Sequence, residues 1–266
     1  VKGDRVLHWY DKDQTSYKID LRGDKRIWGL EEFSVQKPIT RNYIYEYIFH
    51  KLLEANELIS LKYFFINLTL NDSAQGIYAV EEGFSKELIE RNKKRNGPIF
   101  GLEESLGTNY PNVEYDLYSK KYWTTNHSKL TEIALLKLED LKYRNINIEK
   151  IFDLEKWAVF FAIIDLSHTL HGSLSKSVKL YYNPVTAKFE PIGFDGHHNP
   201  NLFNDFLILD FMNDENVNCS YICKEREWYL RFFKNKDGSN NHKFIELYMK
   251  ALKNASSQKF LDNFNS

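Results

Sequence analysis

The sequence contains few of the residues that cross-link or interrupt a chain. Among its 266 residues are two cysteines, six prolines and twelve glycines. Cys219 and Cys223 form a C-x3-C pair, which suits one short disulfide but, without a second pair, makes a poor zinc site. A chain of this length buries a core without cross-links, so we assign both cysteines to packing or to free thiols.

An excess of one charge and long apolar runs are also missing. Lys plus Arg total 36 against 37 for Asp plus Glu, which argues against nucleic-acid binding through bulk charge. No run reaches the roughly 20 apolar residues that a transmembrane helix needs, and we find no signal peptide. We expect no nucleic-acid partner and no transmembrane segment. The chain begins at Val1 in mid-pattern, so we expect a fragment or processed form, with the oligomeric state left open.

The first third of the chain predicts a small sheet with one helix. Polar and apolar residues alternate over 16–22, 32–37, 61–70 and 75–82, and Asn71-Asp72-Ser73 marks a turn. Thr40 is a predicted N-cap for a helix that ends at Glu54. In that helix Ile44, Ile48 and Leu52 share one face, which predicts that this face is packed. Gly83 marks the end of this part.

The remainder predicts a larger, mainly helical part. We read the stretch 101–125 as a long irregular loop or insert, because it is rich in Tyr, Asn and Gly. Asp153 is a predicted cap for a helix that is apolar nearly all round and is therefore buried. Further segments are predicted as helices at 85–94, 128–141, 202–212, 225–233 and 244–252, and as a hairpin at 178–182 and 189–192.

Two carboxylates dominate the segment 160–199. Asp165 ends the apolar helix, and Asp195 follows the hairpin and precedes Gly196. Carboxylates that a strand–turn–strand brings together are common in metal and phosphate sites. Two plainer interpretations stay open: Asp165 as a helix-terminal residue bonded to local backbone, and Asp195 as a turn former beside glycine.

The order helix, Asp, hairpin, Asp is the one found in protein kinases. There the first Asp accepts the proton of the substrate hydroxyl and the second holds Mg²⁺. The upstream part also fits, with a lysine, Lys18, on its first strand. A glycine-rich phosphate loop is not visible, which argues against an ordinary eukaryotic-type kinase.

Four stretches match the motifs of one family in order. They are the strand SYKIDLR at 16–22, Arg41 before the helix, the hairpin at 61–82 that ends in QGIYAVEE, and KLYYNPVT at 179–186, which leads to Asp195. They resemble the KSYKLKL strand, the arginine before the helix, the RLYLNGEYQGLYLLVEQ hairpin and the YYLYRDPATGKWEFIPWDLD segment of the spore coat protein H (CotH) kinase family. The likeness extends from the first strand to just past Asp195.

This resemblance implies an α+β, two-lobed protein kinase-like fold. A small sheet-plus-helix N-lobe would span 1–83, and a larger, mainly helical C-lobe with the catalytic hairpin would span 84–266. The resemblance further implies an atypical kinase that binds ATP and Mg²⁺, with Mn²⁺ as a substitute, and phosphorylates Ser or Thr of a protein substrate. A cell-envelope or extracytoplasmic location is compatible with the family, and the cytoplasm stays open.

The family's functional residues carry over to named positions. Asp165 matches the candidate catalytic base, and Asp195 matches the candidate metal ligand. The candidate nucleotide-binding residues lie in the N-lobe: Lys18, then Lys37, as the phosphate-facing lysine, Glu46 as its partner, and Glu81 and Glu82 near the cleft.

The chain departs from the family at the metal site. A family asparagine falls on Ser177, and the second Asp of the WDLD motif falls on His197. Ser177 and Asn199 are the expected substitutes. This departure supports a second hypothesis, a pseudokinase-like surface or binding protein that keeps the fold without turnover.

The histidines support a third hypothesis. His168, His171, His197 and His198 flank the two Asp residues, and such a set can hold Zn²⁺ or Fe²⁺ in a hydrolase or oxygenase. The H-x2-H spacing lacks the glutamate of H-E-x-x-H, however. Histidines in loops and cores more often serve as hydrogen-bonding groups.

Overall fold

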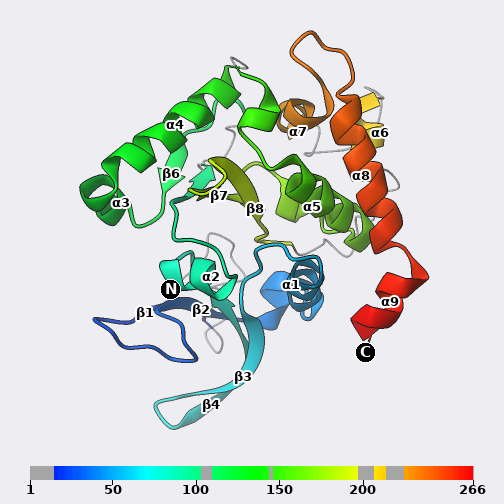
Figure 1. The fold of residues 1–266 in the computed structure, drawn as a ribbon. Helices are drawn as coiled ribbons and strands as arrows, with labels where there is room; N and C mark the ends of the chain where they lie inside the picture. The colour runs from blue at the N-terminus through cyan, green and yellow to red at the C-terminus, as the bar shows by residue number, and fades with distance from the viewer. Residues whose placement is uncertain (1–14, 103–109, 144–145, 197–206, 214–224, 266) are drawn as a thin grey trace.

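Alternating strands and apolar helices fold into a mixed α+β structure with two four-stranded antiparallel sheets (Figure 1). The structure is a computed structural model that describes residues 15–102, 110–143, 146–196, 207–213 and 225–265. None of the helices in these segments is both long and apolar enough to cross a membrane.

The first sheet contains the four predicted N-terminal strands in the order β1-β2-β4-β3. At the β3–β4 turn, Asn71 and Asp72 have positive φ angles of 49° and 60°, a conformation that Asn and Asp tolerate better than most residues. The turn signal in the sequence was therefore correct. The strands are β1 (Tyr17–Asp20), β2 (Glu32–Gln36), β3 (Tyr63–Leu70) and β4 (Ser73–Glu82).

The helix after β2 begins later than the sequence predicts. Residues Pro38–Arg41 form a 3-10 turn, and α1 spans Tyr45–Ala55. The Oγ1 of Thr40 donates to the carbonyl of Lys37 at 2.7 Å inside that turn, so the prediction that Thr40 caps α1 was wrong. Pro38 fixes the backbone at the start of this short turn, where it needs no N–H donor.

The buried face of α1 also differs from the predicted one. Ile44 and Ile48 are 56% and 37% exposed, although we expected them in the core. The residues that are buried instead are Glu46, Phe49, His50 and Leu53. They have the i, i+3, i+4, i+7 spacing of one helical face, and two of them are polar. The helix therefore turns ionisable groups, rather than its isoleucines, toward the interior.

The second sheet has the order β6-β5-β7-β8 and corrects our interpretation of 101–125 as an irregular loop. One of its strands ends in that stretch, a second lies within it, and one helix begins there. The strands are β5 (Ile99–Leu102), β6 (Tyr115–Leu117), β7 (Lys179–Asn183) and β8 (Lys188–Ile192), and the helix is α3 (Lys120–Asn126). All residues of β5 are buried, so the strand shows no alternation by which it could be recognised.

The remaining helices surround the most apolar one, α5. Its N-cap is Asp153, as predicted, and the side chain accepts the N–H of Lys156 at 3.3 Å. Figure 1 shows α5 beside α8, with α1 between α5 and the first sheet. The helices are α2 (Lys86–Arg91), α4 (Ser128–Lys142), α5 (Leu154–Ser167), α6 (Ile208–Asn213), α7 (Arg226–Phe233), α8 (His242–Ala255) and α9 (Gln258–Asn265).

Aromatic side chains fill the space between α5 and the C-terminal helices. Trp157 of α5 lies 4.8 Å from Phe232 of α7, and Phe152 lies 4.9 Å from the same ring. Large buried rings of this kind contribute most of the apolar surface that a core removes from water. The second sheet and its helices therefore have a rigid core, on which the segment after β8 is placed.

Candidate functional site

Asp195 lies just after β8 in a left-handed conformation, with φ 59°. Its Oδ1 forms an ion pair with a terminal nitrogen of Arg41. Its Oδ2 is 3.2 Å from Nδ1 of His171, and that nitrogen is also 3.0 Å from the backbone carbonyl of Asp195. Arg41 belongs to the turn before α1, and His171 to the 3-10 turn Leu170–Ser173 after α5. Asp195 is thus held from both sides.

Arg41 is the centre of a buried charge cluster. Only 7% of its side chain is exposed, and its Nε lies 3.5 Å from Oε1 of Glu81 on β4. Burial opposes the positive charge, but Asp195, then Glu81 and Glu46, outweigh it and raise the pKa of the Arg41 guanidinium above its usual value. Arg41 therefore stays charged and links three carboxylates from three different elements.

Glu46 and His50 complete this cluster on the buried face of α1. His50 Nε2 lies 3.3 Å from Oε1 of Glu46, whose side chain is fully buried. His50 Nδ1 accepts the backbone N–H of Leu61 at 3.3 Å, which assigns the ring proton to Nε2, facing Glu46. We call Arg41, Glu46, His50, Glu81 and Asp195 the Arg41 cluster.

An aromatic ring next to Asp195 lies between two cations. The guanidinium carbon of Arg41 is 5.3 Å from the centre of the Phe194 ring, and Nζ of Lys179 is 5.2 Å from it. Phe84, just after the first sheet, contacts the same ring edge-on at 5.2 Å. Both cations are buried. Cations that are fixed beside a carboxylate are what a phosphate-and-metal site requires.

Ser177, a predicted metal ligand, shares a contact with Asp195 on His171. Its Oγ is 3.4 Å from Nδ1 of His171, the nitrogen that contacts Asp195. The third predicted ligand, Asn199, lies outside the described residues, as do His197 and His198. Within the described segments, no group of three or more His, Cys, Asp or Glu is arranged to hold a metal.

Asp165 is bound by elements other than those that hold Asp195. Its Oδ2 accepts the hydroxyl of Tyr248 on α8 at 2.5 Å, and both its oxygens face the N–H of Ile208 at 3.2 and 3.3 Å. Burial raises the pKa of Asp165 to about 7, although these two hydrogen bonds act in the opposite direction. The carboxylate therefore joins α5 to α8 and α6, and its bonds are long-range rather than local.

Three other predicted residues, Lys18, Glu82 and Lys37, are not members of the Arg41 cluster. Lys18 lies on the edge strand β1, where its Nζ is 2.8 Å from Glu32 and its side chain is 53% exposed. Glu82 forms an ion pair with Arg91 and accepts the N–H of Lys62 at 2.7 Å. Lys37 is buried immediately before the turn that carries Arg41.

The histidines next to Asp165 differ in their surroundings. His168 is exposed and ends α5 with a positive φ of 53°, whereas His171 lies against Asp195. No pattern in the sequence distinguishes these two histidines. Arg41 was likewise noted only for its likeness to a family arginine, and Lys179 only as part of a motif. A local signal was available only for Lys179, a basic residue between the apolar residues Val178 and Leu180.

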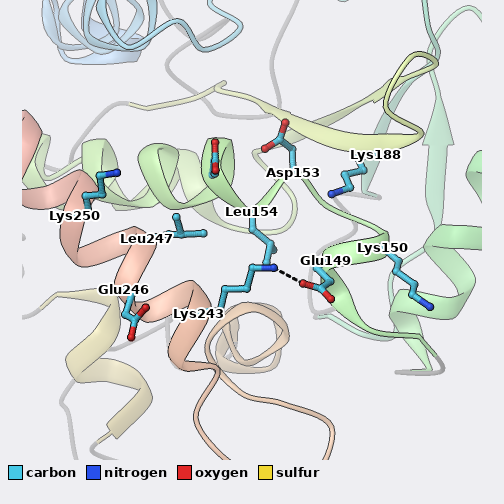
Figure 2. A pocket seen from close by; sticks show the side chains of 10 residues that line it. Glu149, Lys150, Asp153, Leu154, Lys188, Lys243, Glu246, Leu247 and Lys250 are labelled. Carbon is cyan, nitrogen blue, oxygen red and sulfur yellow. Dashed lines mark hydrogen bonds and ion pairs between the residues drawn. The ribbon is translucent and has the colours of Figure 1, made fainter.

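A separate cavity lies at the start of α5 and beside α8 (Figure 2). Its charged lining is balanced, because four lysines face four acidic side chains, and Lys243 lies 2.6 Å from Glu149. None of the predicted site residues lines it. The charged residues are Glu149, Lys150, Asp153, Glu155, Lys188, Lys243, Glu246 and Lys250.

The chain matches no protein-family model, and a search of curated proteins finds no match. The resemblance to the CotH family therefore stays a prediction, and it rests on the motifs quoted above.

Proposed function

We propose that the protein is an atypical, CotH-like kinase that transfers the γ-phosphate of ATP to Ser or Thr of a protein substrate with Mg²⁺. The observation that carries this proposal is the bridge formed by Arg41, which pairs with Glu81 of the first sheet and with Asp195 beyond the β7–β8 hairpin. A buried cation that spans these two regions suits a site for a phosphate and a metal ion.

Several features of the arrangement are compatible with a kinase cleft in which one residue is exchanged. In protein kinases a strand lysine pairs with a glutamate on a helix, and a later aspartate holds the metal. Here α1 connects β2 to β3, its Glu46 is buried, and Arg41 is the cation between Glu46 and Asp195. We assign to Arg41 the role that we predicted for Lys18 or Lys37. On this view 1–83 is the N-lobe.

The donor set near Asp195 is compatible with Mg²⁺. Magnesium prefers oxygen ligands and commonly uses one or two carboxylates together with substrate phosphates. Asp195 supplies a carboxylate, and the hydroxyl of Ser177 contacts the same nitrogen of His171 as Asp195 does. When bound, the metal would neutralise charge on the phosphates; Arg41 and Lys179 would bind phosphate oxygens.

The proton acceptor has two candidates. Asp165 is our predicted base, and a pKa of about 7 suits proton transfer near neutral pH. Its oxygens are engaged by Tyr248 and Ile208, however. His171 is closer to the metal candidate Asp195 and is the alternative that the geometry favours. Asp165→Asn and His171→Asn are compared in the same phosphate-transfer assay, and the variant with the larger loss of activity identifies the proton acceptor.

Phosphate transfer tests the proposal directly. The purified protein is incubated with γ-labelled ATP, Mg²⁺ or Mn²⁺ and a Ser- and Thr-rich protein acceptor. We expect label transfer that Asp195→Asn and Arg41→Met each reduce about 10²-fold or more, as loss of a preorganised charge usually does. Lys18→Met is the matched control, because its ammonium pairs with Glu32 at the exposed edge of the sheet. An inactive wild type, or full activity of Asp195→Asn, contradicts the proposal.

One observation favours the pseudokinase-like alternative. Both oxygens of Asp195 have protein partners, Arg41 and His171, so a metal must compete with them. Thermal stabilisation by ATP and Mg²⁺ without any transfer would support a binding protein that keeps the site without turnover. Metal analysis of the purified protein tests the hydrolase hypothesis, which requires bound zinc or iron.

A further inference from the structure

A second cavity, of about 370 Å³, lies between the end of α4, the segment 146–148 and the end of α7. One wall is apolar and the other is basic. The apolar wall is made by Leu141, Ile146 and Ile148, and the basic side by Arg231, Lys234 and Lys236. Its volume lies within the range of about 300–1,000 Å³ that is usual for small-molecule sites. None of the residues discussed for phosphate transfer lines it.

Arg231 is a buried cation in the lining of this cavity. The residue is 7% exposed, and its Nη2 donates to the backbone carbonyl of Lys142 at 3.2 Å. Its guanidinium carbon is 5.2 Å from the centre of the Tyr110 ring. Its Nε has no hydrogen-bond partner, and no carboxylate forms an ion pair with it among the residues that the structure describes. Arg41, by contrast, pairs with two carboxylates.

A buried guanidinium without a counter-ion is costly, and neither a ring face nor one carbonyl replaces an anion. The acid at the rim does not supply one. Asp237 instead accepts hydrogen bonds from the hydroxyl and the N–H of Ser239, at 2.6 and 2.9 Å. Lys234 donates to the amide oxygen of Asn240 at 2.5 Å, which is a neutral partner. The cavity therefore has an excess of positive charge.

We propose that this cavity binds a small organic anion, namely a carboxylate or a phosphate monoester on an apolar body. Arg231 lines the cavity, and its guanidinium is a planar fork of N–H donors that matches two oxygens of such a group. Lys234 and Lys236 add positive charge at the rim. The apolar body contacts the wall that contains Leu141, Ile146 and Ile148. This inference is independent of the proposed kinase activity.

Equilibrium binding to the full chain tests the site with four probes: phenyl phosphate, benzoate, benzyl alcohol and inorganic phosphate. Isothermal titration calorimetry should show one site for phenyl phosphate or benzoate. Benzyl alcohol and inorganic phosphate should bind at least tenfold more weakly, because each lacks one half of the ligand. Whichever of the first two binds more tightly identifies the anion as phosphate or carboxylate. Equal binding of inorganic phosphate would overturn the apolar half of the proposal.

Matched variants locate the binding. Arg231→Met keeps much of the packing of the side chain and should weaken binding tenfold or more, while Arg231→Lys restores part of it. Arg22→Met, at an exposed position, should bind like the wild type. Asp195→Asn should also bind normally, which separates this cavity from the ATP site.

A second variant tests the proposal if circular dichroism shows that Arg231→Met is unfolded. The rim variant Lys234→Gln/Lys236→Gln should then still bind about threefold more weakly than the wild type. Absence of binding, or unchanged affinity in the folded Arg231 and rim variants, overturns the proposal.

Discussion

Arg41 and Asp195 form an ion pair that joins the turn before α1 to the segment after β8. The same guanidinium lies 3.5 Å from Glu81 on the first sheet, so one side chain connects both sheets. Three carboxylates depend on this cation for charge compensation. The ion pair therefore contributes to the stability of the protein and also orients the carboxylate of Asp195.

Arg41→Met should destabilise the protein by about 3–5 kcal/mol, the usual cost of removing one partner of a buried ion pair. The loss follows because Glu81 and Asp195 stay buried without their cation. Urea unfolding measures it. The double variant Arg41→Met/Asp195→Asn should lose less than the sum of the single losses, because the residues interact. Strict additivity would show that the pair contributes no coupling energy.

The raised pKa of Asp165 predicts a pH-dependent stability. The folded-state pKa of about 7 lies above the usual 3.8, so between these pH values the folded protein binds more protons than the unfolded one. Stability therefore falls as the pH rises from about 4 to about 7. The complete change in pKa would correspond to a loss of more than about 4 kcal/mol in the free energy of unfolding. Because the side chain is only half-buried, we expect a loss on the order of 2–3 kcal/mol.

Asp165→Asn should remove this component, because the amide oxygen still accepts from Tyr248 and Ile208 but carries no charge. Unfolding free energies at pH 4 and pH 7.5 give the comparison, with Asp72→Asn in an exposed turn as the control. If Asp165→Asn and the wild type change equally between the two pH values, burial does not raise this pKa.

Tyr248→Phe tests the same contact from α8. The variant loses the hydroxyl that donates to Asp165 at 2.5 Å. A hydrogen bond to a charged acceptor contributes about 1.5–3 kcal/mol, so the loss should be larger at pH 8 than at pH 5, where the carboxyl is protonated. Tyr143→Phe is the control, since its ring is 66% exposed. A loss that is equal at both pH values would show that the ionised form is not what Tyr248 stabilises.

Local signals in the sequence were sufficient for most elements but not for short buried ones. Alternation and the Asn71-Asp72 turn predicted the first sheet, the Asp153 cap and an apolar run predicted α5, and helices were also predicted where α7 and α8 lie. β5 and β6 were missed because they have only four and three residues, and all four residues of β5 are buried, so β5 shows no alternation. β5 pairs with β7, far along the chain, and β6 pairs with β5; no local pattern indicates the pairing with β7.

The candidate site shows the same limit. Asp195 and Ser177, which we predicted as metal ligands on either side of a short hairpin, both contact Nδ1 of His171, and their role as ligands stays a prediction. Arg41 was not among the predicted site residues because its contacts come from β4 and from the segment after β8, which meet only in the folded chain. Lys18 was chosen from its position on a strand, but the strand lies at the sheet edge, where the ammonium pairs with Glu32.

The last prediction concerns Gly196, the residue after Asp195. A Cβ at this position would lie 2.2 Å from Cδ1 of Phe49, a fully buried ring on α1. Gly196→Ala should therefore cost about 1–3 kcal/mol through overpacking. It should also reduce phosphate transfer tenfold or more, because Asp195 must move with its neighbour. Gly101→Ala is the matched control, since the nearest atoms there are 3.4 Å away.

A second substitution, Phe49→Leu, should restore part of both losses in Gly196→Ala, because the smaller side chain gives space to the new methyl group. If Gly196→Ala has the same unfolding free energy and the same rate of phosphate transfer as the wild type, contact with Phe49 does not position Asp195.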